Sequence, residues 1–430
     1  MKKFILIGCL SSKNWYSFAP LFASLERTSI SRMFDLVILK KRSISVIRKV
    51  VSQYETAILA YSFYTHETPR ISTEIKRIKE KLAHPRIIFV AGGPHASGNP
   101  SQTLQLGFNF IVIGEGEKTF SSLLECICKN EDYSDIKGIC FRKNGKFYVS
   151  NPTEFINLDE YSTFSRKFNL YPPIEITRGC PFGCKYCEVT YLFGKTIRHR
   201  SIDSILKIVK MYQQIFAGRR NTDIRFISPN SLAYGSVDGK IPNYSKIQKL
   251  LKNIHRLGNI RIFFATFPSE TRPEFITSSI LEKISPFIFN KHIAFGAQSG
   301  SNKILKLIGR QHTVEAIRTA TAIISEANLI PIVDFILGLP SEEVEDQYQT
   351  LDLIKELIQK KAEIRIHYFM PLAGTPFEKA SPVPIESAIL SELGRLAKKG
   401  YLKGKIDIQI KNSKKIVKFL QSFNSSCKFL

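Results

Sequence analysis

The segment TRGCPFGCKYCEVT (residues 177–190) gathers three of the eight cysteines of the 430-residue chain, Cys180, Cys184 and Cys187. Three thiolates on one short loop can hold three corners of a cubane iron–sulfur cluster and leave the fourth iron without a protein ligand. Such an iron can bind a substrate or cofactor through nitrogen and oxygen. A fourth cysteine would instead close the cluster into an electron carrier.

A structural zinc site is the alternative for these thiols. Zinc in such sites takes four tetrahedral ligands, commonly from two CxxC pairs. The fourth ligand would have to be the distant Cys140 or His199. In a reducing compartment the remaining cysteines are expected to be small buried hydrophobic residues, not disulfides. These are Cys9, Cys126, Cys128, Cys140 and Cys427.

The stretch CPFGCKYC resembles the CxxxCxxC signature of radical S-adenosylmethionine (SAM) enzymes. The resemblance implies a 4Fe-4S cluster on Cys180, Cys184 and Cys187, with the methionine moiety of SAM chelating the open iron by its amino and carboxylate groups. Reduction then cleaves SAM to a 5′-deoxyadenosyl radical, which abstracts hydrogen from a substrate. Tyr186, before the third cysteine, is expected to flank the adenine.

Four later segments resemble the strand-end motifs of the same family: SPNSLAYGS (228–236), AFGAQSGSNKILKLIGRQHT (294–313), DFILGLPSE (334–342) and HYFMPLAGTP (367–376). The resemblance assigns the first to the SAM amino group, the second to its ribose and carboxylate, the third to the adenine, and the fourth to the end of the sixth strand. Besides Tyr186, the nominated SAM contacts are Ser228, Asn230, Gln298, Ser299, Arg310 and Gly338.

Elements that position these residues can be predicted from hydrophobic runs. The first 130 residues alternate short, nearly continuous apolar runs with helix-length polar stretches, which is typical of a doubly wound parallel sheet. The runs are KKFILIGCL, FDLVILK, TAILAYSF, RIIFVAGG and FNFIVIG. Ligands of such sheets bind beyond the carboxyl ends of the strands. No GxGxxG fingerprint opens the first helix, which argues against a dinucleotide.

The segment GGPHAS…LGFNFIVIGEGEKTF resembles the cobalamin-binding domain that precedes the barrel in cobalamin-dependent radical enzymes. In order and length the chain is similar to archaeal proteins described only as cobalamin-binding and radical domain proteins. The resemblance nominates Gly92, Gly93, His95, Gly114 and Glu115 as cobalamin contacts. The DxHxxG motif that supplies an axial histidine to cobalt is absent. Cobalamin can then bind without a histidine, or the sheet serves as a docking module.

Two histidines at predicted strand ends, His66 and His95, are candidates to approach the corrin. The alternative for each is an ordinary loop histidine with its hydrogen bonds satisfied. The glycines at the strand ends likewise have an alternative role, which is to make turns.

The second half of the chain is predicted to be a partial (β/α)6 barrel, so the fold class is α/β throughout. Its strands are PPIEITR, DIRFISP, IRIFFATF, HIAFGAQ, PIVDFILG and IRIHYFM. A hairpin with its turn at Asn144-Gly145 precedes it. The expected division is 1–130 for the cobalamin-type domain, 131–164 for a connector with the hairpin, 165–380 for the barrel and 381–430 for a basic appendage.

Composition limits the partners. The chain carries 62 Lys and Arg against 37 Asp and Glu, a net charge of +25, which favours RNA or an anionic metabolite as substrate unless it is only compositional drift. No stretch approaches the roughly 20 apolar residues of a membrane helix, and no leader pattern is present, so we expect a cytoplasmic protein without membrane insertion.

These observations predict a radical SAM enzyme that binds a 4Fe-4S cluster, SAM and cobalamin and takes its electron from an external donor of the flavodoxin or ferredoxin type. Methyl transfer to an unactivated carbon or phosphorus is the expected reaction. One alternative is RNA modification without cobalamin. Sulfur insertion is disfavoured because only Cys9 lies in the first 120 residues. The other alternative is a non-catalytic iron–sulfur protein. Acid–base residues remain unassigned among Asp334, Glu342 and His367.

Overall fold

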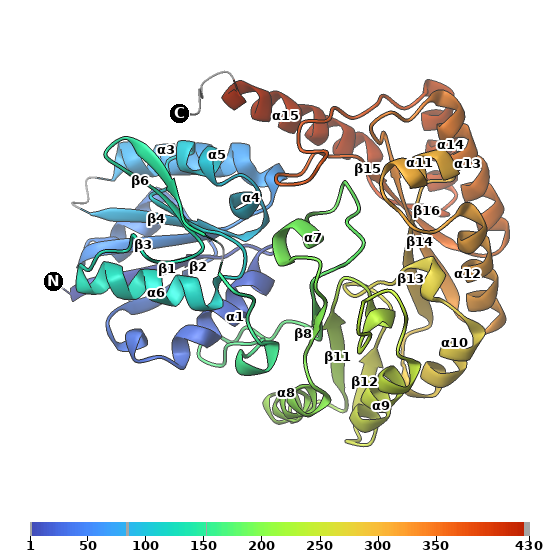
Figure 1. The fold of residues 1–430 in the computed structure, drawn as a ribbon, viewed down its shortest axis with the longest axis horizontal. Helices are drawn as coiled ribbons and strands as arrows, with labels where there is room; N and C mark the ends of the chain where they lie inside the picture. The colour runs from blue at the N-terminus through green and yellow to red at the C-terminus, as the bar shows by residue number, and fades with distance from the viewer. Residues whose placement is uncertain (1, 83–85, 152, 425–430) are drawn as a thin grey trace.

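The computed structural model describes residues 2–82, 86–151 and 153–424 and folds them into two α/β parts that lie side by side (Figure 1). The first part is built on a seven-stranded sheet of order β2-β1-β3-β4-β5-β6-β7, in which β1 to β5 are parallel. Its strands are β1 (Lys2–Cys9), β2 (Asp35–Leu39), β3 (Tyr54–Ser62), β4 (Ile87–Gly92), β5 (Phe110–Val112), β6 (Ile139–Lys143) and β7 (Lys146–Val149).

Helices cover both faces of this sheet, because apolar side chains leave each strand alternately toward either side. One face packs against α1 (Trp15–Glu26) and α6 (Gly116–Lys129), and the other against α2 (Ile44–Val51), α3 (Thr68–Lys81) and α5 (Pro100–Gln105). Leu6 lies in the first core and Ile7 in the second. The predicted doubly wound sheet is confirmed.

The predicted hairpin at Asn144-Gly145 is also confirmed. Both residues have positive φ, 51° and 77°, and β6 pairs antiparallel with β7. The hairpin is not a free connector, however, because β6 also pairs antiparallel with β5. Ile139 and Cys140 of β6 are fully buried, and this burial holds the hairpin against the sheet.

The second part is an open barrel of parallel strands in two sheets, of order β12-β11-β8 and β13-β14-β15-β16. The Ala294 amide donates to the Ala265 carbonyl at 2.8 Å and connects the two sheets. The strands are β8 (Ile174–Glu175), β11 (Thr222–Ile227), β12 (Ile260–Phe263), β13 (His292–Gln298), β14 (Ile330–Leu337), β15 (Glu363–Tyr368) and β16 (Leu402–Lys403). The helices are α8 (Ile202–Ile215), α9 (Tyr244–His255), α10 (Ser278–Ile284), α11 (Asn302–Leu307), α12 (Val314–Glu326), α13 (Val344–Gln359) and α14 (Ser387–Lys398). The predicted partial barrel is confirmed, and its open side lies between β8 and β16.

The end of the described chain is less separate than we expected for an appendage. β16 adds a parallel strand to the barrel beside β15, and α14 packs against α13. The last helix, α15 (Ile406–Asn424), bridges both parts. On the barrel side its Ser413 hydroxyl donates to the Phe369 carbonyl at 2.8 Å. On the other side Phe419 and Phe423 pack against the core of the N-terminal sheet.

Candidate functional site

The cysteine loop lies between strand β9 (Thr177–Arg178) and helix α7 (Glu188–Phe193). Strand β9 pairs antiparallel with β10 (Arg198–His199). Gly179 begins the loop with φ +87°, and a Cβ there would lie 2.2 Å from the Thr196 carbonyl oxygen, so only glycine fits. The Cys180 amide donates to the Gly194 carbonyl at 3.1 Å and the Lys185 amide to that of Ile308 at 2.9 Å. The loop is therefore held from both sides.

The three thiols of the loop are free and lie close enough to influence one another electrostatically. Burial raises the pKa of Cys187 to about 12 and also raises that of Cys180. Without a bound metal the thiols of Cys180 and Cys187 stay protonated at neutral pH. Among the described residues, no three acidic, histidine or cysteine side chains converge on one point as a single metal ion requires. A cubane cluster differs, because each thiolate binds its own iron.

Two arginines approach the same cysteine from the barrel. Arg272 and Arg310 place Nη1 at 3.7 and 3.9 Å from Cys184 Sγ. Arg310 also donates to the Gly296 carbonyl at 2.6 Å, and its buried Nε has no partner in the structure as described. Arg272 pairs with Glu274, whose second oxygen lies 3.3 Å from His312 Nδ1.

The pKa of Glu274 shows that this group is ionised. Burial alone would raise the pKa, but the hydrogen bond from His312 and the charge of Arg272 outweigh burial and lower it to about 2. Neither Arg272 nor Glu274 was found by sequence reasoning. The sequence feature that could have indicated them is TRPE (residues 271–274), which lies in the loop after a barrel strand.

The predicted SAM contacts from β11 and β13 lie at the carboxyl ends of these strands. Asn230 is buried, its Oδ1 accepts from Thr271 at 2.7 Å, and its Nδ2 has no partner within the described part of the chain. Ser228 shares a 2.6 Å hydrogen bond with Ser269. Gln298 closes β13 with φ +73°. A buried amide without a partner at the end of a barrel strand suits a polar ligand.

Three other predicted SAM contacts already have a structural role within the barrel. Ser299 is fully buried and bonds to Thr350 and to the Ser301 amide, so its hydroxyl is already used. Gly338 has φ +73°, and a Cβ there would lie 2.3 Å from the Tyr368 ring, so packing within the barrel already explains this glycine. Tyr186 packs against the barrel core, and burial raises its pKa.

A cavity of about 290 Å³ lies at the carboxyl edge of the N-terminal sheet. Gly92, Gly93, Gly114 and Glu115, which were predicted as cobalamin contacts, line this cavity. On its other side the cavity is lined by residues that flank the cysteine loop: Glu175, Arg178, Leu192 and Phe193. Gly114 has φ +72°, and a Cβ there would meet only the Leu192 carbonyl oxygen at 3.8 Å.

Glu115 does not point freely into this cavity. Its carboxylate accepts from Arg198 Nη2 at 2.5 Å and from the Ile156 amide at 2.9 Å, and it lies 3.4 Å from Arg178. Arg178, which is buried and precedes the cysteine loop, also pairs with Glu117 at 2.8 Å and Glu175 at 2.7 Å. This cluster joins α6 of the first part to the first barrel strand.

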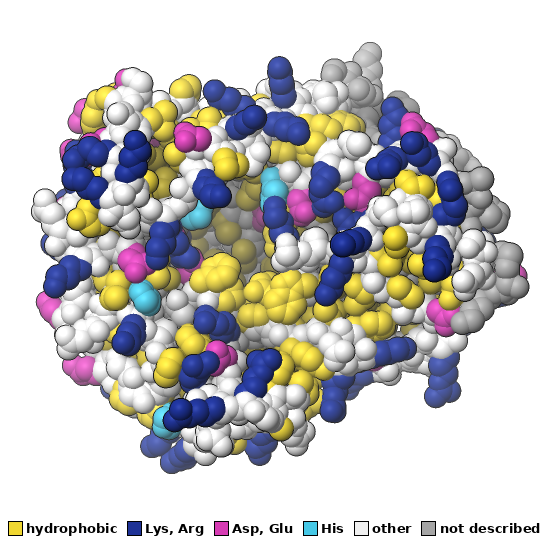
Figure 2. Space-filling view, turned by 180° about the vertical axis from the view of Figure 1, so that it is seen from behind, with side chains coloured by type: hydrophobic (Ala, Val, Ile, Leu, Met, Phe, Trp, Pro, Cys, Tyr) yellow, Lys and Arg dark blue, Asp and Glu magenta, His cyan; other side chains and the backbone are white. Residues whose placement is uncertain are grey.

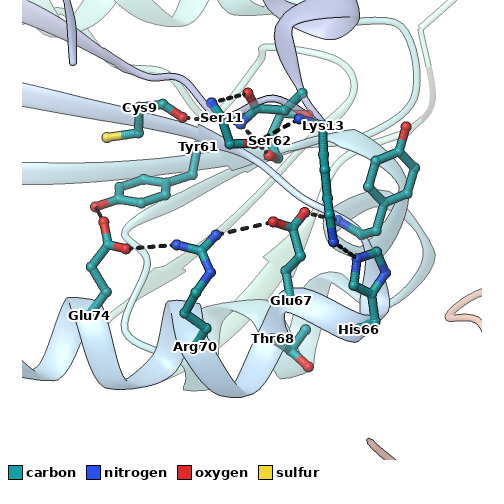
Figure 3. A network of polar contacts seen from close by, with 12 residues as sticks. Cys9, Ser11, Lys13, Tyr61, Ser62, His66, Glu67, Thr68, Arg70 and Glu74 are labelled. Carbon is teal, nitrogen blue, oxygen red and sulfur yellow. Dashed lines mark hydrogen bonds and ion pairs between the residues drawn. The ribbon is translucent and has the colours of Figure 1, made fainter. Parts of the chain in front are cut away.

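The two histidine candidates do not line the cavity. His95 is fully buried on α4 (Gly93–Gly98), with Nδ1 at 3.2 Å from the Thr65 hydroxyl, and burial lowers its pKa to about 3. His95 was predicted as a cobalamin contact, and the structure places its ring in the core and not at the cavity. His66 contacts Lys13 Nζ at 2.7 Å (Figure 3).

A polar chain secures α3 beside this edge (Figure 3). Tyr61, Glu74, Arg70 and Glu67 bond in succession at 3.0, 3.2 and 3.1 Å. The predicted burial of Cys9 is confirmed here. Cys128 and Cys140 are buried as well, whereas Cys126 is only partly buried, and Cys427 lies outside the described residues.

Sequence comparison with known families matches residues 174–354 to the Radical SAM superfamily and residues 33–124 to the B12 binding domain. The chain therefore carries a radical SAM domain and a B12 binding domain. The two matches fall on the barrel with its cysteine loop and on the N-terminal sheet. The predicted enzyme class is confirmed, and so are the predicted cofactors at the level of the families: a 4Fe-4S cluster, SAM and cobalamin.

Individual relatives agree with this assignment. An "uncharacterized methyltransferase" of Pyrococcus horikoshii is 24% identical over 353 residues, 77% of this chain and 70% of the relative. A tRNA-2-methylthio-N(6)-dimethylallyladenosine synthase of Buchnera aphidicola is 27% identical over 327 residues, 75% and 70% of the two chains.

The solved structure of the radical SAM methyltransferase TsrM from Kitasatospora setae, with cobalamin and a [4Fe-4S] cluster bound, has a TM-score of 0.66. It is 14% identical in sequence, and the match covers 87% of this chain and 74% of TsrM. At this identity the likeness shows the fold alone. Because the match covers most of the chain, the likeness includes both the N-terminal sheet and the barrel.

The residues present fit the groups that the family implies. Three free thiols share one loop, with Cys184 buried and Cys180 and Cys187 partly buried. A buried amide at Asn230 lacks a partner among the described residues, and Gly114 leaves open space at the cavity wall. Enzymes of the superfamily take their electron from an external reductant. None of the described helices has the length and apolar character needed to cross a bilayer.

Proposed function

We propose that this protein is a cobalamin-dependent radical SAM methyltransferase. The observation that carries the proposal is the shared wall of the cavity. The same hollow is bounded by the strand ends of the B12-type sheet, at Gly92 and Gly114, and by Arg178 and Phe193 on either side of the cysteine loop. A corrin held there would lie beside the cluster loop, so one substrate could reach both cofactors.

Residue roles follow from this arrangement. Cys180, Cys184 and Cys187 would hold the cluster, which supplies one electron for SAM cleavage when bound. Tyr186, Ser228, Asn230, Gln298 and Arg310 remain the proposed SAM contacts. Gly338 and Ser299 would shape that site through the backbone and through packing. Gly92, Gly93 and Gly114 would line the corrin site, and Glu115 would hold the two parts together.

No described residue lining the cavity is a histidine. We therefore propose that cobalamin binds here without an imidazole from the protein on cobalt. Labelling the histidines of the protein with ¹⁵N should leave the paramagnetic resonance spectrum of bound Co(II) cobalamin unchanged, because any nitrogen splitting would come from the benzimidazole of cobalamin itself.

The substrate and the electron donor are proposed on charge. Figure 2 shows Lys and Arg side chains distributed around a central hollow that is lined mainly by hydrophobic side chains. With a net charge of +25, this surface suits an acidic donor of the flavodoxin or ferredoxin type and an anionic substrate. We propose cytoplasmic operation, where such donors occur.

The test is anaerobic isolation with hydroxocobalamin, followed by reduction in the presence of SAM. We expect about one cobalamin and four irons per chain, together with 5′-deoxyadenosine and S-adenosylhomocysteine as products. Cluster binding and 5′-deoxyadenosine without any bound cobalamin would refute the methyltransferase proposal while leaving the radical SAM assignment intact.

A further inference from the structure

Arg272 is a buried cation aimed at the sulfur of one cysteine. The residue is 4% exposed and its guanidinium lies 3.6 Å above the centre of the Phe182 ring. Its Nε donates to Glu274 at 2.5 Å, and its Nη1 lies 3.7 Å from Cys184 Sγ. The remaining nitrogen, Nη2, is buried without a partner among the described residues.

These contacts fix the guanidinium in place. A planar guanidinium that is stacked on a ring and held by a carboxylate on one edge cannot swing to solvent. The stacking partner Phe182 belongs to the cysteine loop, between Cys180 and Cys184. The orientation of Arg272 is therefore coupled to the loop that would hold the cluster.

Nearby charges of opposite sign act on the same sulfur. Arg310 adds a second guanidinium at 3.9 Å from Cys184 Sγ, while the carboxylate of Glu274 lies behind Arg272. In a buried setting such charges act over several ångströms with little screening by solvent. Hydrogen bonds to cluster sulfurs and local charge are among the factors that set cluster potentials.

We propose that Arg272 is an N–H···S donor that raises the reduction potential of the cluster, and that Glu274 moderates its effect. The inference rests on the proposed role of the three cysteines as cluster ligands. One electron from the external reductant adds one negative charge to the cluster. A fixed cation at Cys184 stabilises the reduced state more than the oxidised state, so the electron is accepted more readily.

Substitutions at the two positions should therefore act in opposite directions. Arg272→Gln removes the charge and weakens the bond to sulfur, so the equilibrium between reduced and oxidised cluster should shift about tenfold toward the oxidised form. For a one-electron couple this corresponds to a midpoint about 59 mV lower. Glu274→Gln removes the opposing charge, so it should raise the midpoint. Arg272→Lys keeps the charge and should fall between Arg272→Gln and the wild type.

The experiment is a redox titration of the reconstituted full chain without SAM, followed by paramagnetic resonance, with iron and sulfide measured for each sample. Omitting SAM separates tuning of the cluster from binding of the SAM carboxylate. Arg395→Gln, which makes the same change at an exposed arginine on α14 paired with Glu392, is the matched control and should leave the midpoint unchanged.

An unchanged midpoint in Arg272→Gln with a full complement of iron would overturn the inference. If Arg272→Gln loses its cluster, the midpoints of Arg272→Lys and Glu274→Gln test the inference instead. A lowered midpoint in Glu274→Gln would then refute it. A wild-type protein that binds no iron–sulfur cluster would refute both the inference and the proposed function. A normal cluster with insensitive variants refutes the inference alone.

Discussion

Replacing Arg178 by methionine should strongly destabilise the junction between the sheet and the barrel. Arg178 is 6% exposed and pairs with Glu115, Glu117 and Glu175 at 3.4, 2.8 and 2.7 Å. Its removal would leave buried carboxylates without their main cation. Breaking a buried ion pair from one side typically costs about 3–5 kcal/mol, and we expect a loss in that range at pH 7.

The cost should depend on pH in a defined direction. Burial would raise the pKa of Glu115, but the bond from Arg198 and the charge of Arg178 outweigh burial and hold the pKa below its ordinary value of 4.5. A carboxylate with a depressed folded-state pKa adds stability above its ordinary pKa and loses it as pH falls through the folded value. The difference between wild type and variant should therefore shrink below about pH 4.5.

The assay is urea unfolding followed by circular dichroism from about pH 3 to pH 8, with each transition fitted separately because the chain has two domains. Arg395→Met, at an exposed pair with Glu392, is the control and should show no measurable change. A cost for Arg178→Met below about 1 kcal/mol at pH 7, the usual value for an exposed pair, would refute the reasoning. So would a cost that does not vary with pH.

Three further outcomes are expected. Cys184→Ala should reduce SAM cleavage to background and lower the iron content, and full turnover in this variant would contradict the cluster assignment. Gly114→Ala and Gly145→Ala both place alanine at positive φ, 72° and 77°, with an expected strain of about 1 kcal/mol each. Only Gly114→Ala should weaken cobalamin binding, measured as the cobalamin retained after gel filtration. Equal retention by the two variants would contradict the proposal that cobalamin binds in the cavity. Burial raises the pKa of Glu342 from 4.5 to about 7, so its contribution to stability is present below pH 4.5 and is lost as pH rises through 7. The stability of Glu342→Gln in thermal unfolding should equal that of the wild type at pH 4.5 and exceed it at pH 8, by at most about 3 kcal/mol. The reverse order would refute the raised pKa of Glu342.

Features set by neighbouring residues were predictable from the sequence. The cysteine loop is local, and its spacing alone indicates a cluster with one open iron. The parallel strands were found because each is a short apolar run between polar helices. The turn at Asn144-Gly145 followed from the conformational freedom of these two residues.

Features set by distant contacts were not predictable. Arg272 and Cys184 are 88 positions apart, and Arg178 and Glu117 are 61 apart, so neither pairing leaves a local pattern. β16 is only two residues long and has too little hydrophobic pattern to be recognised. His95 follows a strand as a ligand residue would, but the short helix α4 turns it into the core.

The bridging helix α15 has a consequence for biogenesis. Its residues follow both folding units along the chain, so a ribosome releases them only after the sheet and the barrel have been made. Until Phe419 emerges, the first unit lacks part of its hydrophobic cover, and other contacts, such as the ion pair of Glu117 with Arg178, hold it to the second. If cobalamin binds between the two units as proposed, it should enter more easily before α15 has docked on both of them.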